Sequence, residues 1–403
     1  MRILLVKLKE PFKETQKPCY MPPLGLWSIR GAINNKDSVD ICDEHIGDNI
    51  ESFLDKNKYD VIGLSVTFSI QHFEYLRVAK IAKASGAFVL AGGIHAGAID
   101  KPEYVDLVIK GGGEQYFNKD VQFAIPDFSI DELERYWIKM APHDLESKTN
   151  KWINIETSRG CFNLCSFCGI RELWKSWTFL PTEDVKKYFS FLKFIGIEEV
   201  FIEDDNVAWD QVRFLEILNL LKKNSFFWST PNGIFIKNIA SSHILDTIFE
   251  TKCWKLSLPF ETGKKSTAKL MNLGNKWIEF EYAYDLINKL KENNIKTAGF
   301  FIIGYPGETL KDMQETLDFA NSLPLDGRNI HIATPYPGSP LYKLCKENNY
   351  LVTDGEELYK NLLYTKGLIK TPDFTPQEVE NLKKEDRDKA IKRKQEQEKN
   401  GSK

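Results

Sequence analysis

Short apolar runs alternate with amphipathic stretches in the first 110 residues. The runs predicted to be strands are 2–7, 38–43, 61–67, 88–93 and 107–110. Between them, residues 26–34 and 73–84 have the spacing of helices. Strands that alternate with helices of about ten residues are typical of a parallel, doubly wound sheet. We therefore expect an α/β, Rossmann-like domain over residues 1–120.

The same rhythm returns after a break. Residues 121–150 hold Pro126, Pro142 and mixed polar stretches, which predicts a linker. Six further strands are expected at 154–158, 199–203, 227–233, 255–260, 297–303 and 328–333, with helices between them, for example at 182–195, 211–223, 277–293 and 310–322. Six strand–helix units predict a partial parallel (β/α)6 barrel over residues 151–345, in which functional groups follow the strands' carboxyl ends.

The end of the chain has a different composition. Residues 346–403 are expected to be a helical segment and a charged tail, dominated from Gln377 by Lys, Glu, Gln and Arg. This pattern predicts a solvated helix or a frayed end without a functional role.

Composition narrows the class of protein. A length of 403 residues predicts two or three domains, and the formal charge of -3 gives no reason to expect nucleic-acid or anionic-membrane binding. No stretch approaches the ~20 apolar residues of a membrane span. The first apolar run ends at Lys7, too early for a signal peptide. Seven cysteines, four of them scattered, fit a reducing cytoplasm.

Three cysteines carry the strongest chemical signal. Cys161, Cys165 and Cys168 follow the first strand of the second set with the spacing C-x3-C-x2-C. Three thiolates suit an iron–sulfur cluster that leaves one iron open for chemistry. A closed electron-transfer cluster or a structural zinc site would want a fourth ligand. A zinc site and a loop of buried thiols remain as alternatives.

This loop closely resembles the cluster-binding motif of the radical S-adenosylmethionine (SAM) superfamily. The resemblance implies that the three cysteines hold three irons of a [4Fe–4S] cluster, and that the open iron binds the amino and carboxylate groups of SAM. One electron then cleaves a carbon–sulfur bond and releases a 5′-deoxyadenosyl radical. Phe167 matches an aromatic position that packs near the adenine. Such a cluster would be oxygen-sensitive.

Later segments also resemble motifs of this superfamily, in order and spacing. Residues 203–206, 258–263, 299–309 and 334–342 match the ends of the second, fourth, fifth and sixth barrel strands. The SAM-binding residues implied by these matches are Glu203, Asp204, Asp205, Glu261, Ile302, Gly304 and Thr334. The acidic group would accept hydrogen bonds from the methionine ammonium, a charge-assisted pairing. Helix capping by Asp205 or Asn206 is the alternative.

Small and polar residues follow the strands of the first set. Glycines there let a backbone approach a large ligand, although ordinary turns also use them. The domain resembles the cobalamin-binding domain that precedes the barrel in one branch of the superfamily. That resemblance implies cobalamin contacts at Gly63, Ser65, Thr67, Gly92, Gly93, His95, Gly112 and Glu114. His95 either hydrogen-bonds the corrin or is satisfied at a turn.

A lower axial histidine for cobalamin is not expected. The loop over residues 8–23 contains no histidine. Residues 43–47 resemble the axial motif, but they are one residue short and follow the second strand. We therefore expect His45 to be a surface loop residue.

The resemblance implies a cobalamin-dependent radical SAM methyltransferase that acts on an unactivated carbon or phosphinate phosphorus of a small molecule, a natural product or a lipid precursor. Flavodoxin or ferredoxin would donate electrons. Cyclisation, rearrangement or oxidation, with or without cobalamin, is the alternative. A non-enzymatic iron–sulfur sensor is opposed by the intact Glu308, Gly304 and cysteine set. Relatives that methylthiolate tRNA usually carry extra cluster cysteines and a basic appendage; neither is found here, so no nucleic-acid partner is expected.

Overall fold

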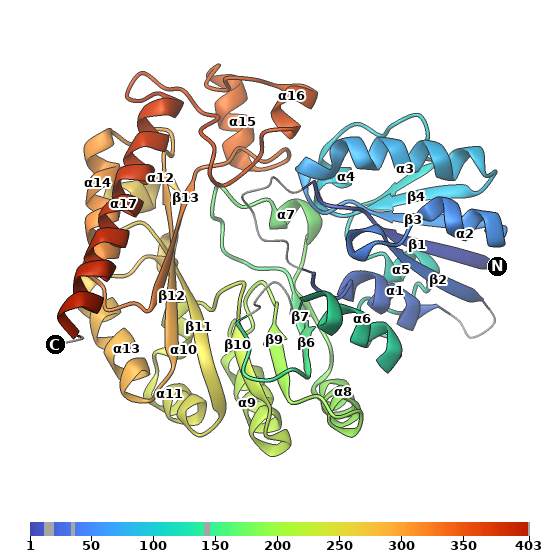
Figure 1. The fold of residues 1–403 in the computed structure, drawn as a ribbon, viewed down its shortest axis with the longest axis horizontal. Coiled ribbons are helices and arrows are strands. Elements are labelled where there is room, and N and C mark those ends of the chain that lie inside the picture. Colours follow the sequence, from blue (N-terminus) through green and yellow to red (C-terminus); the bar gives the residue numbers. More distant parts are fainter. Residues whose placement is uncertain (12–19, 34–36, 141–145, 402–403) are drawn as a thin grey trace. The chain divides into compact units, whose positions relative to one another are not determined.

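The computed structural model describes residues 1–11, 20–33, 37–140 and 146–401, which form two compact units (Figure 1). The first unit contains residues 1–162 and 169–257, and the second contains 163–168 and 258–403. The linker predicted at 121–150 lies within the first unit, and residues 141–145 of it lie outside the described residues. The predicted domain boundaries therefore stay predictions.

The first unit opens with a five-stranded sheet in the order β2-β1-β3-β4-β5, with all neighbours parallel. Its strands are β1 (Arg2–Lys7), β2 (Ser38–Asp43), β3 (Val61–Ser65), β4 (Phe88–Gly92) and β5 (Leu107–Ile109). Residues 3–6 of β1 are at most 2% exposed, as expected for a parallel strand covered on both faces. The predicted doubly wound sheet is confirmed, with strand bounds within two residues of those expected.

Helices connect these strands and cover the sheet. They are α1 (Leu24–Ala32), α2 (Ile50–Lys56), α3 (His72–Ala84), α4 (Ile94–Ala98) and α5 (Glu114–Phe117), with short 3-10 turns η1 (Glu44–Ile46) and η2 (Ser69–Gln71). Apolar side chains of α3 recur at helical spacing, and Tyr75, Val78, Ala79 and Ala82 pack in one core with β3 residues. The apolar residues whose spacing predicted this helix are therefore the ones that it buries.

The predicted linker contains a helix, α6 (Ile130–Met140). Its buried residues Leu133, Tyr136 and Met140 recur at helical spacing, and the Tyr136 hydroxyl donates to Asp43 at 2.7 Å. The helix was not predicted because its periodicity is short and two prolines lie nearby. Its buried residues show that the segment packs as part of the first unit.

The second set of strands follows chain order, β6-β9-β10-β11-β12-β13, and the ladders β6–β9, β9–β10, β10–β11 and β12–β13 are parallel. In the first unit lie β6 (Trp152–Ile155), β9 (Glu199–Ile202), β10 (Phe227–Thr230) and the start of β11 (Lys252–Glu261), with helices α8 (Thr182–Phe194), α9 (Gln211–Asn224), α10 (Ile236–Ile239) and α11 (Ser242–Phe249). Neighbouring strands therefore follow one another along the chain, as in the predicted partial (β/α)6 barrel. In such barrels the active groups lie after the carboxyl ends of the strands.

The strand predicted at 154–158 is divided. After β6, the chain forms β7 (Ser158–Arg159), which pairs antiparallel with β8 (Thr178–Phe179). Between these two short strands lie the cysteine loop and α7 (Ile170–Leu173). The small two-stranded sheet therefore closes the base of this long loop.

The second unit continues from β11 through β12 (Lys296–Ile303) and β13 (Gly327–Ile332). Its helices are α12 (Lys265–Leu270), α13 (Phe280–Glu292), α14 (Leu310–Ser322), α15 (Pro340–Glu347), α16 (Gly355–Tyr359) and α17 (Pro376–Gly401), with the 3-10 turn η4 (Gly274–Lys276). Among the described residues, none of the helices combines the length and apolar character that crossing a membrane requires.

The charged end of the chain is partly packed. Helix α17 lies against α14 and β13 (Figure 1). Val379 is 1% exposed within the core of the second unit, and buried Asp386 pairs with Arg328 at 2.7 Å. The expectation of a wholly solvated or frayed tail is therefore wrong for the first three turns of this helix.

Candidate functional site

A cavity of about 410 Å³ lies within the first unit, where loops follow the carboxyl ends of β1, β3, β4 and β5. Ligands of open parallel sheets bind at such strand ends. Seven of the eight residues predicted for cobalamin line it: Gly63, Ser65, Thr67, Gly92, Gly93, Gly112 and Glu114. Strands β6 and β7 and the loops beside them complete the wall with Asn154, Glu156, Arg159, Glu203 and Asp205.

Several glycines of this wall leave little room for a side chain, Gly93 and Gly63 among them. Gly93 has φ +103°, and an added Cβ would lie 2.5 Å from the carbonyl oxygen of Val66. At Gly63 an added Cβ would lie 2.9 Å from Leu5. At Gly92, in contrast, the nearest atom would be the Ile109 oxygen at 3.8 Å, so the space beside this residue is open. A wall of bare backbone fits a broad ligand that lies flat against it.

His95 does not line the cavity. It is 1% exposed, and its Nε2 lies 3.0 Å from Nδ1 of His72 on α3. Burial lowers the pKa of His95 to about 3, so the ring is neutral. The ring is thus buried on α4 against His72, away from the cavity wall.

The prediction that His45 is a surface residue is wrong. His45 is 5% exposed within η1, and its Nδ1 accepts a hydrogen bond from the Glu10 backbone at 3.3 Å. Asp43 caps this turn by accepting from the His45 backbone at 2.9 Å. The short 3-10 turn folds the ring inward, where an irregular loop would have exposed it.

Three carboxyl groups from the barrel loops face the cavity. Burial raises the pKa of Glu203 to about 7, and burial likewise raises that of Asp205 to about 7, where Glu156 and Asp204 add to the effect. Burial also raises the pKa of Glu156. Asn154 donates to Glu203 at 3.1 Å, while its buried Oδ1 has no hydrogen-bond partner. The wall can therefore both accept and, when protonated, donate hydrogen bonds.

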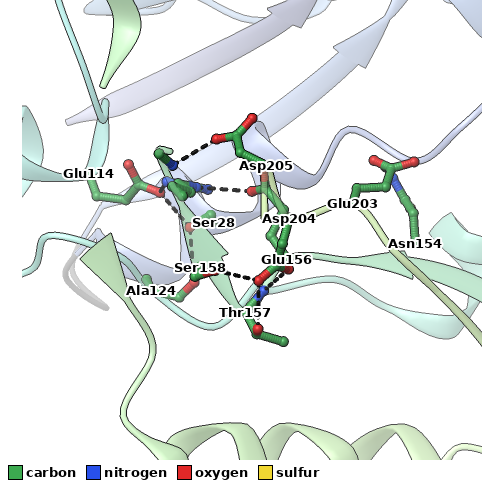
Figure 2. A network of polar contacts seen from close by, with 12 residues as sticks. Ser28, Glu114, Ala124, Asn154, Glu156, Thr157, Ser158, Glu203, Asp204 and Asp205 are labelled. Carbon is green, nitrogen blue, oxygen red and sulfur yellow. Dashed lines mark hydrogen bonds and ion pairs between the residues drawn. The ribbon is translucent and has the colours of Figure 1, made fainter. Parts of the chain in front are cut away.

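One buried cation balances this acidic wall. Arg159 contacts Glu114 at 2.6 Å and Glu156 at 3.0 Å, and its guanidinium lies 4.0 Å from the centre of the Phe123 ring. Burial opposes the charge, but the two carboxylates outweigh it and raise the pKa of Arg159. Glu114 also accepts from Ser28 at 2.5 Å, as Figure 2 shows. Glu114 thus joins the first sheet to the start of the cysteine loop.

Asp204 differs from its neighbours because it does not line the cavity. It is 2% exposed and accepts from the Thr157 amide, the Thr157 hydroxyl and the Ser158 hydroxyl at 2.6–2.7 Å (Figure 2). Asp205 accepts from the Gly160 amide at 2.7 Å. The cap of α9 is Asp210, so the capping alternative for Asp205 and Asn206 is wrong. These two aspartates instead hold the strand that leads into the cysteines.

The cysteine loop divides between the units. Cys161 lies one residue before the end of the first segment, in the first unit, and is half-buried. In the second unit, Cys165 is 6% exposed and Cys168 is half-buried. Residues 1–11, 20–33, 37–140 and 146–401 contain no group of His, Cys, Asp and Glu arranged for a single metal ion. In a cubane cluster each thiolate binds a different iron. Three cysteine thiolates are the donors that such a cluster takes, so the chemistry of this loop fits one.

Within the second unit, the segment that follows β11 holds residues 163–168. The Ser166 amide donates to Met271 at 3.0 Å, and Asn272 donates to Leu164 at 2.9 Å. The hydroxyls of Ser166 and Tyr305 lie 2.7 Å apart. These contacts anchor both sides of Cys165 within the second unit.

The remaining residues predicted for SAM lie in the second unit. Ile302, Phe167 and Cys165 belong to one apolar cluster. Gly304 has φ +81°, with an added Cβ 3.0 Å from Val379, and buried Thr334 donates to the Ile332 oxygen at 2.8 Å. Glu261 is 6% exposed and pairs with Lys276 at 2.5 Å. Five of the residues predicted to bind SAM thus lie in this unit, and their role in SAM binding stays a prediction.

Sequence reasoning missed Glu156, Arg159 and Lys276. Arg159 had a usable signal, since a charged residue stands in a buried β-strand immediately before Gly160. Lys276 had none, because a lysine in a polar turn is usually solvated. Its burial depends on contacts with residues distant in the sequence.

Comparison with known proteins finds a matching family, relatives in sequence and a similar fold. Residues 155–320 match the family described as the radical SAM superfamily. An uncharacterized methyltransferase of Pyrococcus horikoshii is 24% identical over 90% of this chain and 86% of its own. Cytidylyl-2-hydroxyethylphosphonate methyltransferase of Streptomyces wedmorensis is 27% identical over 60% of this chain, but over only 46% of its own length.

A solved structure shares the fold. The radical SAM methyltransferase TsrM from Kitasatospora setae, solved with cobalamin and a [4Fe–4S] cluster, superimposes with a TM-score of 0.70. The match covers 88% of this chain and 79% of TsrM at 14% identity. The superfamily uses a [4Fe–4S] cluster and SAM, and the cysteine loop and the ordered strands agree with its pattern. Residues 155–320 therefore carry a radical SAM domain, and the chain is similar in sequence to methyltransferases and in fold to TsrM.

Proposed function

We propose that this enzyme binds cobalamin beside its radical SAM centre and transfers a methyl group to an unactivated carbon or to phosphorus of a small molecule. The observation that supports this most is the glycine-lined cavity of about 410 Å³ at the strand ends of the first sheet. The relatives agree with this proposal, since two are named methyltransferases, one of them of a phosphonate, and TsrM was solved with cobalamin.

Each part of the site has a separate task in this proposal. Cys161, Cys165 and Cys168 hold the cluster. When bound, the cluster supplies the electron that cleaves SAM, and cobalamin carries the methyl group. The bare backbone at Gly92 and Gly93 receives the flat face of the corrin. The carboxyl groups facing the cavity accept hydrogen bonds from amide or ammonium groups and exclude bulk water by their burial.

The electron donor in this proposal is a small redox protein such as flavodoxin or ferredoxin. Cyclisation, rearrangement or oxidation of the substrate is the second candidate reaction, because the same radical initiation precedes each of them. The products separate these reactions, since only methyl transfer adds the mass of a methylene group.

The experiment is anaerobic reconstitution with iron, sulfide, cobalamin and SAM. We expect corrin absorbance bands that remain with the protein after gel filtration, and 5′-deoxyadenosine after reduction. Gly92→Leu fills the cavity without a backbone clash, because the nearest neighbour of an added Cβ is 3.8 Å away. This variant should lose the corrin bands and keep its iron.

Gly327→Leu is the matched control. Gly327 is exposed at the start of β13, and an added Cβ meets nothing within 4 Å. It should bind cobalamin as the parent protein does. Parent protein without corrin bands would refute the cobalamin part of the proposal, and a fully loaded cluster that yields no 5′-deoxyadenosine would refute the radical part.

A further inference from the structure

A buried ion pair stands beside the cysteine loop in the second unit. Lys276, at the end of η4, has a side chain that is 13% exposed, and Glu261, the last residue of β11, has one that is 8% exposed. Their Nζ and Oε1 atoms are 2.5 Å apart. Burying two charges costs several kcal/mol per ion, so such a pair needs further interactions to be retained.

Lys276 also faces the thiolate side of the loop. Its Nζ lies 5.8 Å from the ring centre of Phe167, the residue immediately before Cys168. Negative charge on Glu261, Cys165 and Cys168 raises the pKa of Lys276 and outweighs its burial. Trp277, the next residue, packs in the same apolar cluster as Cys165. The ammonium is therefore buried against Glu261 and beside the segment that carries Cys165 and Cys168.

Glu261 holds this arrangement at a cost in backbone strain. It adopts φ +66°, in the left-handed region that residues with a side chain rarely use. Strain of this kind occurs mainly at functional sites. In this conformation the carboxylate reaches Lys276, so the strained residue serves to place the cation.

We propose that Lys276, held by Glu261, is a positioning residue that sets the reduction potential of the cluster bound by Cys165 and Cys168. A reduced cluster carries one more negative charge than an oxidised one. A nearby cation stabilises the reduced form and makes the potential less negative, because net charge around a cluster is one of the factors that set its potential. The inference rests on the proposed cluster and is independent of cobalamin and of the methylated substrate.

The test is a redox titration of the reconstituted protein without SAM, monitored by electron paramagnetic resonance, in which dithionite supplies one electron per cluster. Lys276→Met should shift the midpoint potential to a more negative value, and Lys276→Arg should restore it. Glu261→Gln should shift it in the opposite direction, because the lysine charge is then no longer neutralised. Lys269→Met removes the same charge from the exposed end of α12 and should leave the potential unchanged.

The opposite signs keep the test decisive. If Lys276→Met fails to assemble a cluster, Glu261→Gln alone decides, and a potential that is unchanged or more negative would overturn the inference. Equal midpoint potentials in Lys276→Met and Lys269→Met would also overturn the inference. Parent protein that assembles no cluster would instead contradict the proposed function, so the two failures are distinguishable by iron content.

Discussion

Arg159 and Glu114 form a buried ion pair, with 2.6 Å between the guanidinium and the carboxylate and side chains only 4% and 1% exposed. Glu114 follows the last strand of the first sheet, and Arg159 lies two residues before the first cysteine. The pair therefore ties the wall of the cavity to the segment that enters the cysteine loop, both within the first unit.

Arg159→Met should destabilise the protein strongly. The substitution leaves Glu114 buried without its cation, and breaking a buried pair in this way costs about 3–5 kcal/mol. The free energy of unfolding from urea titration measures the loss. Arg171→Met is the control, since Arg171 is exposed on α7 and should change stability by less than about 0.5 kcal/mol. Equal stability of the two variants would show that the Arg159 pair contributes nothing.

Asp204→Asn should weaken the fold. Three donors converge on this carboxylate at 2.6–2.7 Å, and an amide presents hydrogens to some of them. A buried donor left unsatisfied costs about 1–3 kcal/mol. The measurement is again urea unfolding, with the exposed Asp246→Asn on α11 as the control.

The same variant separates a structural role for Asp204 from the SAM contact that the sequence predicts. A loss of stability with unchanged SAM affinity would assign Asp204 to the scaffold. Unchanged stability with a weakened SAM affinity would show that Asp204 contributes to SAM binding, as the sequence predicts.

The sequence predicted much of this molecule because its signals are local. Apolar runs such as residues 2–7 are buried on both faces of the sheet, so their composition alone predicts a strand. Glycines at 63, 92, 93 and 112 follow strand ends, and parallel topology brings such ends to one edge. The cysteine spacing is similarly readable from three positions.

What the sequence did not predict depends on contacts between distant residues. Lys276 stands in a polar turn, and only the fold brings it to Glu261. His45 has the surroundings of a surface loop, yet η1 turns it inward. Asp204 and Asp205 are adjacent in sequence, but one side chain faces the cavity and the other lies beneath the strand that leads to the cysteines.

Glu203 should make stability depend on pH. Burial raises its pKa from 4.5 to about 7, so the folded protein keeps a proton that the unfolded chain has released between these values. Stability therefore falls as pH rises through this window, and the cost is complete above about pH 7. In the protein without cofactors, Glu203→Gln should be more stable than the parent by about 1–3 kcal/mol at pH 8.

The pH profile supplies the control for this prediction. Near pH 4 both proteins carry a neutral side chain at position 203, and the difference should disappear. Glu183→Gln, on the exposed face of α8, should show no such dependence. A difference that is equal at pH 4 and pH 8 would mean that the glutamate carboxyl does not titrate in this window.

Asp386→Ala should detach the packed part of α17. Asp386 is 6% exposed, pairs with Arg328 of β13 at 2.7 Å and accepts from Asn321 of α14 at 2.9 Å. Losing this partner leaves Arg328 mostly buried with no carboxylate, at a cost of about 3 kcal/mol. Thermal unfolding followed by circular dichroism should show an earlier transition. Glu385→Ala, one residue away on the exposed face, should melt as the parent does. Because Val379 of the same helix packs on Gly304, an Asp386→Ala protein that melted normally would mean that this apolar contact alone holds the helix.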